Sequence, residues 1–434
     1  MAAARNRTRT NSPIVRLMSP LRDFLALEAA GAILIAAGAL AALIWANSPW
    51  SASYDSLWAS RASLAVAGHT LDLDLRHWVN DGLMTVFFLV VGLEIKRELT
   101  DGHLSTRRAA LLPGAAALGG MLVPALVYLA IAGSTAPRGW AIPMATDIAL
   151  AVGVLAVAGP RIPSSLRAFL LGLAIVDDIG AIVIIALVYS TGVRLGWLAA
   201  AAAAVALAVA ARRVGVSAIW VFVVIGGCVW FGLHEAGIHP TLAGVLMGLL
   251  APSEPRLQAE LIDAEELADV SDIVAARTTT QLARGSVSVV EWLQHMLHPW
   301  TSYVIVPIFA LANSGIAVSA DALRDALGSP IFWGVALGLL AGKPLGVVLA
   351  TRAATKSGVA DLPEDSTSRQ VFGIGAAAGI GFTVALFITE LALTDPADQS
   401  TAKLAILVAS LLAAAVATVL LSATRARVVM PPPE

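Results

Sequence analysis

The stretch AIVDDIGAIVII at residues 174–185 places two adjacent acids, Asp177 and Asp178, inside an apolar run. An aspartate at the centre of a membrane helix costs about 2.5–3.5 kcal/mol, and each Leu, Ile, Phe or Val returns about 0.3–0.6 kcal/mol. The apolar residues of 166–190 nearly offset this cost, so the segment can insert if neighbouring helices or water receive the carboxylates. Intramembrane carboxylates are generally functional, and we interpret the pair as a functional site.

The composition is that of a polytopic membrane protein. Of the 434 residues, 58% are hydrophobic and 13% are charged, and the mean hydropathy is +0.81. The net charge of −2 indicates no nucleic-acid partner. The single cysteine, Cys228, can form no internal disulfide.

Runs of about 20 apolar residues are long enough to cross the hydrocarbon core of a bilayer. They predict an all-α protein with twelve transmembrane helices, at 24–46, 77–98, 109–131, 138–158, 166–190, 195–211, 215–233, 238–251, 293–316, 330–351, 370–391 and 402–424. Most of the 28 lysines and arginines lie on the side that holds both termini. The positive-inside rule therefore predicts that both termini are cytoplasmic.

We expect one transmembrane domain over residues 1–434, with three segments outside the helical pattern. Residues 51–76 are extracytoplasmic, and LAVAGHTLDLDL (64–75) alternates around a Gly-His turn, which predicts a short β-hairpin. Residues 253–290 form an acidic cytoplasmic loop, and 426–434 form a disordered tail.

Two further charged residues lie at membrane depth. Asp147 occurs in WAIPMATDIALAVG (140–153), after Pro143 and an Ala-Thr-Asp step, and Lys343 occurs in LGLLAGKPLGVVLA (337–350). The segment GIGAAAGIGF (373–382) interrupts another apolar run with four glycines. These glycines do not follow a strand, so they are not a dinucleotide-binding motif; close helix packing remains one explanation for them.

A second explanation is that 138–158 and 370–391 are broken helices, each in the middle of a three-helix unit. Paired interrupted helices in two inverted repeats indicate the midplane site of a transporter. The two units would be 109–131, 138–158 and 166–190, and 330–351, 370–391 and 402–424. Broken helices leave dipole ends inside the membrane, and Asp147 and Lys343 have the signs that would compensate them.

The chain resembles the NhaA-type sodium/proton antiporters over nearly its whole length. The resemblance is carried by VNDGLMTVFFLVVGLEIKREL (79–99), GWAIPMATDIALAVGVLA (139–156), LAIVDDIGAIVIIALVY (173–189), GIHPTLAGV (237–245), HMLHPW (295–300), GKPLG (342–346) and GIGFT (379–383). It implies a multi-pass protein of the bacterial cytoplasmic (inner) membrane. Its partners would be sodium, lithium and protons, with no cofactor, and it would form a homodimer through the 51–76 region.

The resemblance also implies roles for individual residues. Asp178, Asp177 and Thr146 would form the cation and proton site. Asp147 and Lys343 would balance the half-helix ends, and Lys343 would also be the partner of Asp177. Glu94, Glu98 and the segment with His295 and His298 would lie at the cytoplasmic mouth, where pH is sensed.

Asp81 can be placed by helix geometry. The residues between Asp81 and Glu94 span only about 18 Å of helix, which is too short to cross the hydrocarbon core. One or both acids must therefore lie in a water-filled funnel.

Competition between ions at one site accounts for exchange. A carboxylate binds a hard cation only when it is deprotonated, so cation binding releases protons. A site that faces one side at a time would then exchange cytoplasmic sodium or lithium for external protons and serve pH and sodium homeostasis. The alternatives are an intramembrane aspartyl protease, which needs its two acids on separate helices, and a passive cation channel, which gives no reason for Lys343.

One position departs from the family pattern. The residue before HxxHPW is typically a glutamate in this family, whereas this chain has Gln294, which cannot titrate. Glu291 lies three residues earlier and on the same helix face, so its carboxylate could take the place of that glutamate. The simpler interpretation of Glu291 is an ordinary solvated acid at a helix start.

Overall fold

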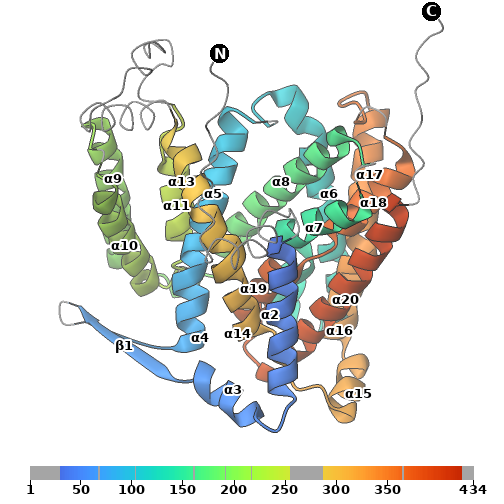
Figure 1. Ribbon diagram of the computed structural model, residues 1–434, viewed down its shortest axis with the longest axis horizontal. Coiled ribbons are helices and arrows are strands. Elements are labelled where there is room, and N and C mark those ends of the chain that lie inside the picture. Colours follow the sequence, from blue (N-terminus) through green and yellow to red (C-terminus); the bar gives the residue numbers. More distant parts are fainter. Residues whose placement is uncertain are drawn as a thin grey trace, which may run out of the picture.

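The computed structural model describes residues 30–66, 69–102, 104–159, 162–190, 192–216, 218–254, 287–363 and 366–422. The first residues of the expected span 24–46, most of the acidic loop 253–290 and the tail 426–434 lie outside these residues. The described chain is mostly helical, with one small sheet (Figure 1).

The elements of the N-terminal half, in chain order, are α2 (Ala30–Ala46), α3 (Ser51–Trp58), β1 (Arg61–Val66), β2 (His69–Asp74), α4 (Leu75–His77), η1 (Trp78–Leu83), α5 (Met84–Thr100), α6 (Arg107–Ala132), η2 (Pro137–Met144), α7 (Ile148–Ala158), α8 (Ser164–Val188), α9 (Leu195–Arg213), α10 (Ile219–Ala236) and α11 (Leu242–Leu250).

The elements of the C-terminal half are α13 (Val289–Trp300), η4 (Thr301–Ile305), α14 (Val306–Asn313), α15 (Ala320–Gly328), α16 (Pro330–Leu337), η5 (Gly338–Gly342), α17 (Lys343–Lys356), α18 (Ser368–Ala378), α19 (Phe382–Ala392) and α20 (Pro396–Ser422). The segment η2 is a 3₁₀ helix, and η1, η4 and η5 are π-helical turns within longer helices.

The described helices confirm a polytopic apolar bundle. Eight of them are long and apolar enough to cross a membrane, or up to ten if each of two bent helix pairs forms one span. The number of spans expected from the sequence, twelve, stays a prediction. The expected span 238–251 corresponds to α11, which has only 9 residues.

The β-hairpin expected near residues 64–75 is present. Strands β1 and β2 pair antiparallel, with Val66 opposite His69. His69 is therefore the first paired residue of β2 rather than part of the turn, and the hairpin begins at Arg61. The hairpin extends away from the helices at the end of the molecule that also holds α3 and α15, which we call the hairpin end (Figure 1).

Glycines let α6 pack closely against α17. A Cβ atom on Gly119 would lie 2.3 Å from the Gly346 carbonyl oxygen, so neither position accepts a side chain. Gly120 faces Val347 and the aliphatic part of Lys343. Small residues allow membrane helices to approach in this way, and here they bring the start of α17 into the bundle.

Candidate ion-binding site

Two helices are interrupted inside the bundle, and their interruptions touch. Residues 145–147 separate η2 from α7, and residues 379–381 separate α18 from α19. The Asp147 backbone N–H donates to the Ile380 carbonyl, with an N–O distance of 2.6 Å. Four helix ends thus meet in one place, and each leaves backbone groups without helical partners.

Asp147 caps two helices with one carboxylate. Its Oδ1 accepts a hydrogen bond from the Leu150 N–H in the first turn of α7, at 3.0 Å. Its Oδ2 accepts from the backbone N–H and the hydroxyl of Thr383, at the start of α19, at 3.0 and 2.7 Å. The side chain is buried. A negative charge at two helix N-termini has the favourable sign for both dipoles, as charge compensation requires.

Lys343 lies at the same crossing, next to the C-terminal end of η2. It directly follows the π-helical turn η5, and its Nζ donates to the Met144 carbonyl at the C-terminal end of η2. Its Nζ also lies 2.9 Å from Asp177 Oδ2, and neither side chain is exposed. The positively charged ammonium group of Lys343 therefore contacts both a helix C-terminus and a carboxylate, and each of these carries negative charge.

Asp177 is held by two groups through one of its oxygens. The Thr146 hydroxyl donates to the same Oδ2 atom at 2.7 Å, and this hydroxyl also lies 3.1 Å from the Ala378 carbonyl at the end of α18. The other oxygen, Oδ1, is buried and has no hydrogen-bond partner among the described residues. Buried acceptors are usually paired, so this oxygen is available to a ligand.

Asp178 has a different environment from its neighbour. The residue is 6% exposed, and its carboxylate makes no hydrogen bond or ion pair with the part of the chain that the structure describes. Consecutive residues of α8 point about 100° apart, which accounts for the different partners of the two acids.

Glu94 and Glu98 lie one turn apart on α5. Glu94 is half-buried, and Glu98 is buried. Between them, Arg97 donates from Nη1 to Gln294 Oε1 on α13 at 3.3 Å. The structure therefore joins α5 to α13 through Gln294, the position at which the sequence departs from the family pattern.

The other residues expected at the cytoplasmic mouth lie on the exposed face of α13. Glu291, His295 and His298 are exposed. The Glu291 carboxylate accepts from the Ser288 hydroxyl at 3.2 Å, and Ser288 Oγ accepts from the Glu291 N–H. Glu291 thus takes part in capping α13. Neither histidine ring makes a hydrogen bond or ion pair with a described residue.

Asp81 lies in η1, separate from Asp177 and Asp178. It is buried, and its Oδ1 is 3.9 Å from His239 Nδ1. The rings of Phe88 and Phe387 pack with centroids 5.4 Å apart, and Phe387 also contacts the His239 ring. In the sequence, Phe88 lies between Asp81 in η1 and Glu94 in α5.

Several residues of the site were not found from the sequence. Thr383, the second partner of Asp147, is the second residue of α19, two positions after the glycine-rich break at 379–381, and this position was the only available signal. The carbonyls of Met144 and Ala378 carry no side-chain signal. The buried Asn80–Asn313 pair, in which Asn313 Nδ2 donates to Asn80 Oδ1 at 2.8 Å, was also missed.

Comparison with known sequences identifies the family of the chain. Residues 22–421 match the family described as Na+/H+ antiporter 1. The chain belongs to this family of Na+/H+ antiporters. Its members are transporters and not enzymes, in agreement with the resemblance seen in the sequence.

Individual antiporters of this family are similar over most of their length. The chain is 44% identical over 416 residues to the Na+/H+ antiporter NhaA 2 of Sorangium cellulosum, which covers 92% of the chain and 89% of that protein. It is 43% identical to the Na+/H+ antiporter NhaA 3 of Frankia alni, in an alignment that covers 92% of this chain and 88% of that protein. It is 42% identical to the Na+/H+ antiporter NhaA of Oleidesulfovibrio alaskensis, in an alignment that covers 92% of this chain and 93% of that protein.

Proposed function

We propose that the chain exchanges cytoplasmic sodium or lithium for external protons, with Asp177 and Asp178 as the shared ion site. The observation that carries this proposal is the contrast between the two acids. Asp177 is fixed by Lys343 and Thr146, whereas the Asp178 carboxylate has no partner among the described residues. A carboxylate without a fixed partner can take up either a proton or a cation, and the two compete for it.

Oxygen atoms suited to a hard monovalent cation gather at this point. Asp178 supplies a carboxylate, Asp177 supplies its unpartnered Oδ1, and Thr146 supplies a hydroxyl one residue before Asp147. Oxygen donors are the ligands that such cations prefer. These three residues are our proposed sodium, lithium and proton site, with Asp147 and Lys343 compensating the charges of the helix ends.

Alternating access would occur by movement of the two interrupted helices against the rest of the bundle. The breaks at 145–147 and 379–381 supply points at which half-helices can move, and they adjoin the proposed site. The inverted relation between the two three-helix units stays a prediction. We propose that Glu94, Glu98, Glu291, His295 and His298 set the pH response at the cytoplasmic side, and that Asp81 lies in the external funnel.

The placement of the acids disfavours an intramembrane aspartyl protease. Asp177 and Asp178 both lie on α8, whereas two acids that share one scissile bond need to face each other. A passive channel would not require a lysine beside its cation path, where Lys343 lies.

We further propose that the protein is a multi-pass homodimer of the bacterial inner membrane with both termini cytoplasmic. The hairpin supports the dimer. Its strands β1 and β2 pair only with each other in the described chain, so both outer edges retain unpaired backbone groups. Such edges are templates for pairing with another chain, and an isolated two-stranded sheet is only marginally stable.

The test is proton movement driven by sodium or lithium in proteoliposomes that contain the purified chain. An inside-acidic vesicle should lose its proton gradient when sodium is added outside, for the wild type and for Asp361→Asn, an exposed acid that serves as control. Asp178→Asn should fold and show no exchange. Sodium-driven proton movement at the wild-type rate in Asp178→Asn would exclude this site.

A further inference from the structure

The half-helix α19 is buried along almost its whole length. Every residue from Phe382 to Thr389 is buried. Its first turn carries Thr383, which binds Asp147 through both its backbone N–H and its hydroxyl. The position of α19 therefore determines where Asp147 finds its second partner.

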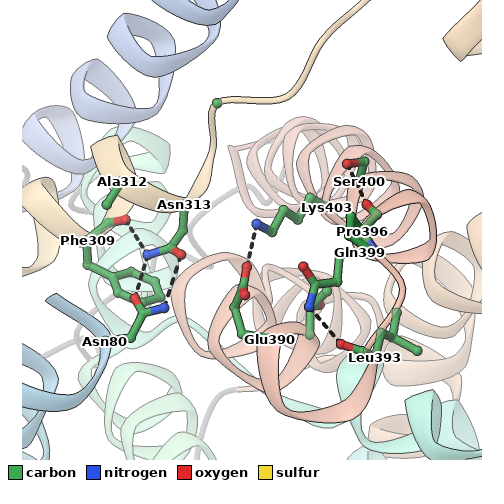
Figure 2. A network of polar contacts seen from close by, with 12 residues as sticks. Asn80, Phe309, Ala312, Asn313, Glu390, Leu393, Pro396, Gln399, Ser400 and Lys403 are labelled. Carbon is green, nitrogen blue, oxygen red and sulfur yellow. Dashed lines mark hydrogen bonds and ion pairs between the residues drawn. The ribbon is translucent and has the colours of Figure 1, made fainter. Parts of the chain in front are cut away.

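The other end of α19 is attached to α20 by two polar contacts (Figure 2). Lys403 Nζ lies 2.5 Å from Glu390 Oε1, with the two side chains 9% and 19% exposed. Gln399 Nε2 donates to the carbonyl of Leu393, the residue that follows the last turn of α19, at 2.7 Å. Both contacts join the C-terminal end of α19 to the first turns of α20.

Fold stability alone is a poor explanation for this ion pair. Replacement of a mostly buried ion pair by packed apolar residues is often neutral or stabilising. Glu390 also lies near the C-terminal end of α19, where the helix dipole disfavours an acid, and Lys403 supplies the opposing charge. The pair therefore specifies how α19 is attached to α20.

Helix α20 supports the site from several sides. It packs against α7, which Asp147 caps, against α16 and η5, which precede Lys343, and against α19. Thr383 and Glu390 are separated by about 10 Å along one short helix, so a shift at Glu390 is transmitted to Thr383.

We propose that Glu390 and Lys403 are positioning residues for ion exchange. They fix the far end of α19 against α20, so that Thr383 at its near end holds Asp147 at the crossing of the interrupted helices. This inference rests on the proposed function, because its effect is exerted on the Asp177–Asp178 site. Neither residue is proposed to bind the transported ion.

The test compares single and compensated variants of the full-length chain in proteoliposomes. Glu390→Gln and Lys403→Met should lower the turnover per folded protein by about tenfold, since misplacement of a functional group by about 1 Å can cost on the order of 10²-fold. The conservative Lys403→Arg and the charge-exchanged Glu390→Lys with Lys403→Glu should recover most of the turnover. The control is Glu235→Gln, which removes the 3.3 Å Arg194–Glu235 pair and should leave turnover unchanged.

Melting temperature and folded yield separate positioning from stability. If the pair acts only on stability, the single variants will melt earlier while turnover and the KM for sodium, both per folded protein, stay at wild-type values. That result overturns the inference, as does a Lys403→Arg variant no more active than Lys403→Met. Absence of exchange in the wild type would instead contradict the proposed function.

Discussion

Lys343 and Asp177 form an ion pair of 2.9 Å in which neither side chain is exposed to solvent. The lysine also donates to the Met144 carbonyl, and the aspartate also accepts from the Thr146 hydroxyl. This charge pair thereby connects α17, which begins at Lys343, and the end of η2 to α8.

The first prediction concerns removal of the lysine. Lys343→Ala should destabilise the fold by about 3–5 kcal/mol, because removal of one partner leaves a buried charge without compensation. Addition of Asp177→Asn should restore much of that loss. Unfolding of the purified protein in detergent, for both single variants and the double variant, gives the coupling energy. Additive effects of the two substitutions would show that the residues are not partners.

The second prediction concerns Thr383. Thr383→Val keeps the shape and the backbone N–H but removes the hydroxyl that donates to Asp147 at 2.7 Å. A hydrogen bond to a charged group contributes about 1.5–3 kcal/mol, and loss of this one should lower both stability and exchange. Thr389→Val is a matched control on the same helix, since that hydroxyl donates to the Ala385 carbonyl within α19 and not to Asp147. Equal exchange rates in the two variants would argue against a role for the Asp147–Thr383 contact.

The sequence identified the charged residues of the site better than their contacts. Asp177, Asp178, Asp147 and Lys343 were evident because each is costly in an apolar run, and the breaks were evident from Pro143 and the glycines. The partner of Asp147 was not, because Thr383 lies 236 residues away and ordinary threonines are common in helices. The Met144 and Ala378 carbonyls have no sequence signal, since every residue carries a carbonyl.

The ends of the helices were also predicted best where the signal is local to the sequence. Long apolar runs such as 166–190 predicted α8 well, because hydropathy alone defines them. The nine-residue α11 and the π-helical turns η1, η4 and η5 depend on packing against neighbours, which periodicity does not report. The hairpin turn was placed one residue late, since strand pairing rather than the Gly-His signal fixes the register.

The third prediction concerns the hairpin. Deletion of β1 and β2 should shift the purified protein from dimer to monomer, because the proposed dimer depends on the unpaired strand edges. Exchange should persist, since the hairpin is remote from α8, the helix that carries Asp177 and Asp178 (Figure 1). Analytical ultracentrifugation in detergent measures the state of assembly. A deletion variant that remains fully dimeric would place the interface elsewhere.

The last prediction concerns Gln294. In the structure its Oε1 accepts from Arg97 at 3.3 Å, and the side chain is buried. Gln294→Glu replaces this neutral acceptor with a titratable one, which pairs with Arg97 only when ionised. The contact between α5 and α13 should then become pH-dependent, and the exchange profile against pH should shift. Glu291→Gln should have a smaller effect, because Glu291 is exposed and its carboxylate accepts from Ser288, the N-cap of its own helix.

Measurement of exchange rate against pH for wild type, Gln294→Glu and Glu291→Gln decides between the two positions. Arg97→Gln in the Gln294→Glu background is the control, because it removes the cation that the new carboxylate would pair with and should return the profile toward the wild type. If Gln294→Glu leaves the profile unchanged, the α5–α13 contact does not set the pH response. If the wild type shows no activation beyond the titration of its own aspartates, no separate pH sensor operates in this chain.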